Sequence, residues 1–96
     1  MKNLILKDLV NNSSSVEEGI VLFNKLKKAY LDKTIVLLEV DSNLSLSSSF
    51  LNASVGAFLD DYGLENFKLT VKFKGSKTQF HKISRYIESY KELYLV

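Results

Sequence analysis

Three consecutive serines, Ser47, Ser48 and Ser49, follow an aspartate, Asp41, that comes directly after an apolar run at residues 34–40. The pattern predicts a buried strand whose carboxyl end presents an acid and three hydroxyls at the start of a helix. Open α/β sheets place their working surface at this end of the strands. A helix start also favours an anion or a phosphate, because its backbone N–H groups are unpaired and its dipole is positive. We therefore expect the functional site of the protein at Asp41 and the three serines.

The serine cluster has two interpretations. Serine is among the best helix N-caps, so any one of the three hydroxyls could simply cap the following helix. Three serines behind a buried strand are more than one cap requires. The excess favours a phosphate-related or docking role.

Asp41 could act as a catalytic acid or base, or it could accept loop N–H groups in an Asx turn, which is the commoner role. Catalysis would need a second titratable group beside it, and the sequence indicates none. Asp60 and Asp61 are neighbours in the expected helix, about 100° apart around its axis, so they do not form a facing carboxylate pair. A solvated helix face accounts for them, and we expect no enzyme.

Metal and phosphate motifs are absent from the sequence. His81 is the only histidine and there is no cysteine, so we expect no metal site and no cofactor. The stretch Gly75-Ser76-Lys77-Thr78 is similar to the end of a P-loop. That motif requires adjacent glycine and lysine and a second glycine upstream, and neither condition is met.

One concentration of basic residues lies around the last expected strand and helix. A solvated surface is the usual explanation, and nucleic-acid binding would also require exposed aromatic side chains or a recognition helix. The tyrosines fall mostly on apolar stripes, with Tyr86 as the plausible exception. The alternative function is a small-ligand or nucleic-acid binding domain that uses the strand ends and this basic face. Its residues are Lys72, Lys74, Lys77, Lys82 and Arg85.

The helix expected after the serines carries a face of small residues, with Asn52 and Asp60 beside it. A glycine inside a helix costs about 1 kcal/mol relative to alanine, so Gly56 indicates close packing against the sheet or against a partner. The small residues are Ser49, Ala53, Gly56 and Ala57.

Length and composition narrow the class of protein. Ninety-six residues predict a single domain, residues 1–96, with one core. A net charge of +2 is too small to indicate a nucleic-acid partner by itself. The apolar run near the first residue is too short for a signal peptide or a membrane span, so we expect a cytoplasmic protein and no membrane contact.

The first half of the chain predicts a strand, a helix and a second strand. Lys2 to Lys7 is a short strand with Leu4 and Leu6 on one face. A helix from about residue 15 to residue 31 begins with a capping box, Ser14 with Glu17 or Ser15 with Glu18. The uninterrupted apolar run at residues 34–40 predicts a central, parallel strand that is buried on both faces. The expected buried stripe of the helix is Val16, Ile20, Phe23, Leu26 and Tyr30.

The second half predicts a helix, a strand and a helix. The helix from about residue 48 to residue 62 ends at Gly63, which suits the αL position. Strict alternation with lysine over residues 68–74 predicts an edge strand with Leu69, Val71 and Phe73 on its inner face. The buried residues expected on the two helices are Leu51, Val55, Phe58, Leu59 and Tyr62, then Phe80, Ile83, Ile87, Tyr90 and Tyr94.

The resulting order is β-α-β-α-β-α. Strands that alternate with helices predict crossover connections and a mainly parallel sheet. The fold class expected from the sequence is therefore a single-domain α/β layer fold.

The stretch VLLEVDSNLSLSSSFLNASVGAFLDDYG, residues 36–63, resembles the core of STAS domains, the fold of anti-sigma-factor antagonists. It is most similar to an uncharacterised bacterial STAS-like branch, in which a strand ending in aspartate leads through a serine-rich turn and a phenylalanine into a helix. The resemblance covers residues 15–73.

In the antagonist family an Asp-Ser-x-Gly turn opens the second helix, and a kinase of the histidine-kinase-like ATPase fold phosphorylates its serine. An ungapped match places Ser47 at the aspartate, Ser48 at the phosphorylated serine and Phe50 at the glycine, so two positions differ. The loop after Asp41 is also a residue or two shorter.

The resemblance implies a non-enzymatic regulatory module that docks a protein partner, such as that ATPase, through the serine loop and the second helix. Phosphorylation would switch the docking, with Ser48, Ser49 and Ser47 as the candidate sites. The residues it implies for partner binding are Asp41, Ser47, Ser48, Ser49, Asn52, Ala53, Gly56 and Asp60.

Overall fold

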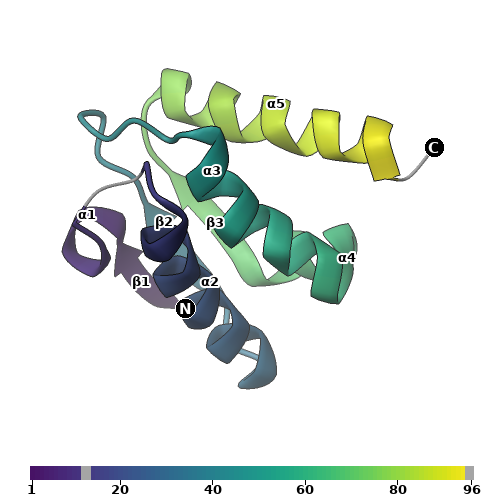
Figure 1. Ribbon diagram of the computed structural model, residues 1–96. Helices are drawn as coiled ribbons and strands as arrows, with labels where there is room; N and C mark the ends of the chain where they lie inside the picture. Colours follow the sequence, from purple (N-terminus) through teal and green to yellow (C-terminus); the bar gives the residue numbers. More distant parts are fainter. Residues whose placement is uncertain (12–13, 95–96) are drawn as a thin grey trace.

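The computed structural model describes the backbone of residues 1–11 and 14–94 and the side chains of these ranges as far as residue 92. Strands and helices alternate as expected, with an additional short helix after the first strand (Figure 1). A π-helical turn lies inside the second long helix. In chain order the elements are β1 (Lys2–Ile5), α1 (Leu6–Leu9), α2 (Val16–Leu31), β2 (Val36–Glu39), α3 (Ser48–Leu51), η1 (Asn52–Gly56), α4 (Ala57–Thr70), β3 (Val71–Lys74) and α5 (Lys77–Tyr94).

The three strands form one parallel sheet in the order β1-β2-β3. Leu4 pairs with Leu38, and Leu38 pairs with Phe73. The predictions of a parallel sheet, of a central strand after residue 34 and of a lysine-bearing edge strand are confirmed.

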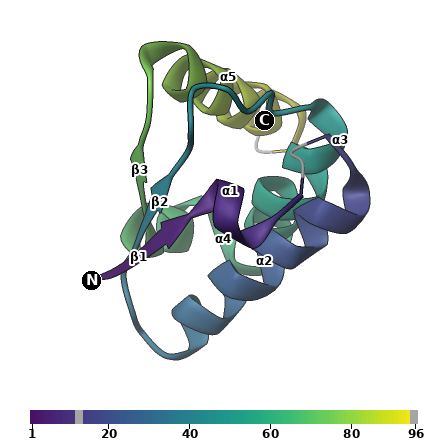
Figure 2. The same cartoon turned by 90° about the vertical axis from the view of Figure 1, so that its left-hand side faces the viewer.

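The prediction that the central strand, β2, is buried on both faces is wrong. Val36 and Leu38 are buried, whereas Leu37 between them is half-buried and Ile35 just before the strand is 41% exposed. The reason is the layering, because α2 and the helix that begins at Ser48 stack on one side of the sheet (Figure 2). A strand in a two-layer structure can bury only alternate side chains.

Helix α2 begins where the sequence predicts. Ser15 is the N-cap, and its Oγ accepts the N–H of Glu18 at 3.3 Å. Ser15 with Glu18 is therefore the pair that marks the helix start.

The predicted buried stripe of α2 is wrong in part. Leu26 is buried, but Val16 and Ile20 are 48% and 47% exposed. The helix is turned so that Gly19 lies against the neighbouring helix, and this close approach selects a different face. The residues buried on α2 are Gly19, Leu22, Leu26 and Ala29.

Elements α3, η1 and the first part of α4 form one continuous helical run, which we name the central helix (residues 48–62). Its predicted inward residues are confirmed, because Leu51, Val55, Phe58 and Leu59 are buried and Tyr62 is half-buried.

Gly63 interrupts this run with φ 85° and ψ 164°. The positive φ agrees with the prediction for this glycine, although ψ lies far from the αL value. The chain then returns to helix as far as Thr70, so the strand predicted from residue 68 begins only at Val71. Phe67 packs on Phe58 at 5.6 Å between ring centroids, which keeps this turn helical and leaves Leu69 67% exposed. The inner position predicted for Leu69 is therefore wrong.

The first strand ends two residues earlier than predicted, because Leu6 opens α1 and is fully buried there. On α5, Ile83, Ile87 and Tyr90 are half-buried as expected. Helix α5 lies over one end of the molecule (Figure 1). Phe80 in its first turn is 55% exposed, contrary to the prediction, because its ring packs on the half-buried Phe73, at 6.0 Å between ring centroids, and not in the core. The side chain of Tyr94 lies outside the described residues.

Candidate functional site

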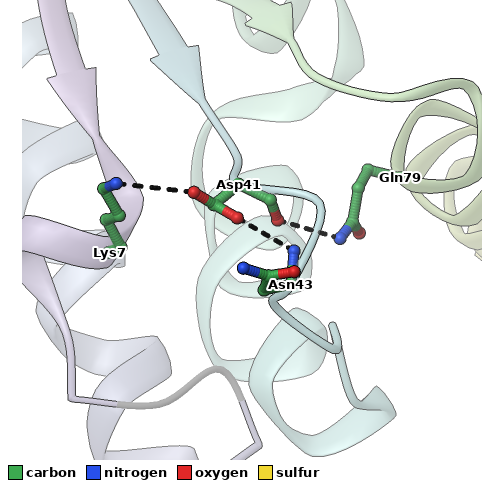
Figure 3. A network of polar contacts seen from close by, with 4 residues as sticks. All are labelled: Lys7, Asp41, Asn43 and Gln79. Atoms are coloured by element: carbon green, nitrogen blue, oxygen red, sulfur yellow. Dashed lines mark hydrogen bonds and ion pairs between the residues drawn. The ribbon is translucent and has the colours of Figure 1, made fainter.

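Asp41 organises the loop that leaves the carboxyl end of β2 (Figure 3). One carboxylate oxygen accepts the backbone N–H of Asn43 at 2.9 Å, which forms an Asx turn, and the other lies 3.5 Å from Nζ of Lys7. The carbonyl of Asp41 accepts Nε2 of Gln79 at 3.2 Å, and the same amide donates to the carbonyl of Leu44. Asp41 thus joins α1, the loop and α5.

These contacts lower the pKa of the Asp41 carboxyl. The N–H of Asn43 is the main cause that lowers its pKa, Lys7 adds to the effect, and partial desolvation opposes both. A general acid at neutral pH needs a raised pKa, so this environment favours a structural role for the carboxylate.

We expect Lys7→Met to raise the pKa of Asp41 while leaving it below its ordinary value, because the Asn43 N–H remains. A lowered carboxyl pKa stabilises the fold above the unfolded pKa of about 3.9, and this stabilisation is lost as the pH falls through the folded value. The variant should therefore lose less stability than the wild type on acidification. NMR titration of the carboxyl carbon measures the pKa, and an unchanged pKa would show that Lys7 does not act on Asp41.

A hollow lies at the carboxyl ends of the strands, lined by Ile5, Lys7, Glu39, Asp41 and Lys74 among others. Two ion pairs lie in it, Lys7 with Asp41 at 3.5 Å and Lys74 with Glu39 at 3.3 Å. Each lysine is thus already beside a carboxylate, and an anionic ligand would have to compete with that carboxylate.

The three serines differ in their availability. Ser47 is the N-cap of the central helix, where its Oγ accepts the N–H of Phe50 at 3.1 Å and donates to the carbonyl of Ser14 at 2.9 Å. Ser48 and Ser49 occupy the first two helical positions and are exposed, and their side chains have no hydrogen bond with the part of the chain that the structure describes. Two accessible hydroxyls therefore stand at the start of this helix.

The bond between Ser47 and Ser14 also places the starts of α2 and the central helix side by side. The two helices cross at Gly19, where an added Cβ would lie 2.7 Å from both Cβ of Ala53 and the carbonyl oxygen of Phe50. Inside the π-helical turn, the buried hydroxyl of Ser54 donates to the same carbonyl at 2.7 Å. The small side chain of Ala53 thus serves the contact between the two helices.

The other predicted docking residues face α5. Gly56 is buried, and a Cβ there would overlap the hydroxyl oxygen of Tyr86. That hydroxyl donates to Oδ1 of Asn52 at 2.7 Å, and the hydroxyl of Tyr90 donates to Oδ1 of Asp60 at 2.8 Å. Tyr86 is therefore half-buried in an intramolecular contact, which corrects its interpretation as an exposed aromatic.

One part of this region remains open to solvent. Val16 and Ile20 flank Gly19 on α2, next to the crossing with the central helix, and each is nearly half exposed. The exposed hydroxyls and an exposed amide lie on the central helix itself. We name this surface the open face; it consists of Val16, Ile20, Ser48, Ser49 and Asn52.

The basic residues are divided between two surfaces. Lys72 donates to the carbonyl of Lys68 at 3.0 Å, and Lys74 pairs with Glu39. The other three, Lys77, Lys82 and Arg85, are exposed on α5, as is His81. Asp60 and Asp61 are exposed on the central helix. Among the described residues, no group of three or more acidic, histidine or cysteine side chains is placed to hold a metal ion.

Three residues important here were not singled out from the sequence. Gly19 could have been found, because a glycine inside a helical pattern indicates a close contact. Lys7 and Gln79 act on Asp41 across 34 and 38 residues of chain, and nothing in their local sequence indicates this.

A small parallel sheet, helices stacked on one face and a capped serine turn that opens the central helix define an α/β domain of the STAS-like class. Residues 18–79 match the family described as "STAS-like domain of unknown function (DUF4325)". The match spans more than half of the chain, and the protein belongs to this family. Searches among curated proteins and among solved structures give no match. In the described part of the chain, no helix combines the length and apolar character needed to cross a bilayer.

Proposed function

We infer that the protein is a non-enzymatic regulatory module that docks a protein partner through the open face and the serine turn. The observation that carries this function is the pairing of exposed hydroxyls, Ser48 and Ser49, with exposed apolar side chains, Val16 and Ile20, on two adjoining helices. Apolar side chains that remain in water beside hydrogen-bonding groups are typical of protein interfaces.

In this proposal the residues have different tasks. Asp41 and Ser47 fix the shape of the loop through their hydrogen bonds. Ser48, Ser49 and Asn52 contact the partner, with half-exposed Ala53 between the helices. The whole chain, residues 1–96, acts as one domain.

The proposed partner is an ATPase of the histidine-kinase-like fold in the cytoplasm, as the family resemblance implies. Its phosphate would go to Ser48 or Ser49, and less readily to Ser47, whose hydroxyl is engaged on both sides. A phosphate on Ser48 adds about −1.5 to −2 charges. The helix start tolerates this charge, whereas a docked partner would have to bury it, so phosphorylation would release the partner.

Photo-crosslinking in the host cell tests the proposal. A benzophenone amino acid at Ser49 should give an adduct with one protein, an ATPase of that fold. The matched control is Lys25, which is exposed on the opposite side of α2 from Ile20. Equal adducts at both positions, or none at Ser49, would contradict docking through this face.

A further inference from the structure

The first half of α5 presents a row of basic side chains to solvent on the side that faces away from the rest of the domain. Gln79 is buried and Ile83 is half-buried on the inner side of this part of the helix. The exposed side chains opposite them form what we name the outer face of α5; they are Lys77, Phe80, His81, Lys82 and Arg85. Four of the five can carry a positive charge, and the fifth is aromatic.

Two adjoining hollows of the surface lie along this outer face. One lies among Lys77, His81, Lys82 and Arg85, and the other around Phe80 and the half-buried Phe73. Lys77 and His81 line both hollows. A ligand that extends along the helix can therefore contact the cations and the aromatic ring together.

The lysine and arginine side chains of the outer face have no carboxylate beside them. In the part of the chain that the structure describes, Lys77, Lys82 and Arg85 take part in no ion pair, whereas Lys7 and Lys74 at the strand ends are each paired with an acid. An anionic ligand on the outer face has no acidic side chain to displace.

The small net charge of the chain conceals a strong separation of charge. Residues 66–87 contain six of the thirteen lysine and arginine residues and none of the eleven aspartate and glutamate residues. This segment therefore carries +6 and the rest of the chain −4, which together give the total of +2. An ordinary solvated surface intersperses both signs, whereas a concentration of one sign attracts a ligand of the opposite charge.

Phe80 supplies the exposed aromatic side chain that the sequence did not indicate. Its ring is 55% exposed and packs on Phe73 at 6.0 Å between centroids, which holds it beside Lys77 and His81. Cations along a groove combined with an exposed aromatic ring are the features by which proteins bind single-stranded nucleic acid, since the cations follow the phosphates and the bases stack on the ring.

We propose that the outer face of α5 binds single-stranded nucleic acid, with phosphates at Lys77, Lys82 and Arg85 and a base stacked on Phe80. A helix rises about 1.5 Å per residue, so Lys77 and Arg85 are about 12 Å apart along the axis. This is the length of about three to four phosphates of a stacked strand. The site is independent of the proposed function, because the outer face and the open face share no residue.

The choice of nucleic acid over an acidic peptide follows from the combination of groups. A nucleic-acid strand offers one flat base for every phosphate, so a ring can stack on Phe80 in any register of the strand. A duplex keeps its bases stacked on one another and cannot offer one to the ring without being opened. The expected ligand is therefore a strand with unpaired bases.

The electrostatic part of the site is tested with the full chain and a fluorescently labelled oligothymidylate of about twelve nucleotides, between about 50 and about 200 mM salt. Three neutralised phosphates predict that the logarithm of the affinity falls with the logarithm of the salt concentration with a slope of about −2. Lys82→Gln should make this slope shallower by about 0.7, because one phosphate contact is lost. The matched control, Lys25→Gln, removes an exposed lysine from α2 and should leave the slope unchanged. Fluorescence anisotropy measures the affinities.

The stacking part of the site is tested at Phe80, where substitution leaves the charge unaltered. Phe80→Leu should weaken binding of the oligothymidylate about tenfold without changing the salt slope, because stacking of a base is lost while the phosphate contacts remain. Phe80→Tyr keeps an aromatic ring and should bind as the wild type does. Thermal unfolding checks that both variants are folded.

Two further probes identify the class of ligand. An abasic strand of the same length should bind the wild type about as weakly as the oligothymidylate binds the Phe80→Leu variant, and Phe80→Leu should not weaken it further. The proposal is overturned if the abasic strand, or an oligoglutamate peptide of equal charge, binds the wild type as tightly as the oligothymidylate, because the outer face would then recognise charge alone. A salt slope that Lys82→Gln does not change, or an affinity that Phe80→Leu does not change, would also overturn it.

Discussion

Replacing Phe58 by alanine is expected to lower the free energy of unfolding by about 3–5 kcal/mol. Phe58 is fully buried on the central helix, with Tyr30, Tyr62 and Phe67 around it at centroid distances of 5.7, 5.1 and 5.6 Å. Edge-to-face pairs add to the loss of buried area. The loss is a large part of the about 5–15 kcal/mol that stabilises a typical domain, and urea denaturation measures it.

Phe80→Ala is the matched control, because the same atoms are removed from a side chain that is 55% exposed. We expect it to cost less than about 1 kcal/mol. If both variants lost the same stability, the Phe58 cluster would not be the core that holds the central helix against α2.

Replacing Ser48 by aspartate is expected to weaken partner association at least about tenfold, or about 1.4 kcal/mol. Aspartate places a charge on the open face that a docked partner would have to bury. The fold itself should not suffer, because an acid in the first turn of a helix is favourable. Calorimetric titration with the partner identified by crosslinking measures the affinity, and thermal unfolding checks the fold.

Ser48→Ala provides the control for this charge. The N-cap of the central helix is Ser47, so the alanine variant keeps the cap and should bind nearly as well as the wild type. Equal affinities for the aspartate and alanine variants would leave the phosphorylation switch without support. The serines would then have only the structural role of starting the central helix.

The sequence was sufficient to predict the structure wherever a local pattern corresponds to one structural role. The uninterrupted apolar run from Ile35 to Leu38 predicted the central strand, and the serine-glutamate spacing predicted the start of α2. The serine-rich turn before Phe50 was sufficient for the family resemblance, which the match over residues 18–79 confirms.

The sequence was insufficient where tertiary packing decided between two local possibilities. Val16 and Ile20 have the spacing of a buried stripe, yet the backbone contact at Gly19 turns the helix and leaves them in water. Residues 68–70 alternate like a strand, but packing of Phe67 on Phe58 keeps them helical. In both cases a contact distant in sequence outweighed the local pattern.

The candidate site shows the same division. The pattern of small residues correctly indicated close packing at Ala53 and Gly56. It could not indicate that α2 covers Ala53 and α5 covers Gly56. An amphipathic pattern predicts which face of a helix is covered but not which element covers it. This is why the open face is smaller than the docking surface expected from the sequence.

The central claim is that a protein partner docks through the open face. The most direct test is NMR chemical-shift mapping of the backbone amides of the isotope-labelled chain, on addition of the partner that crosslinking identifies. Docking through the open face predicts that the largest shifts occur at Ser48, Ser49 and Asn52 and at Val16 and Ile20 across the helix crossing. Shifts confined to Lys77, Lys82 and Arg85, or to the strand ends at Lys7 and Lys74, would contradict the account and favour the basic face or the strand ends as the binding surface.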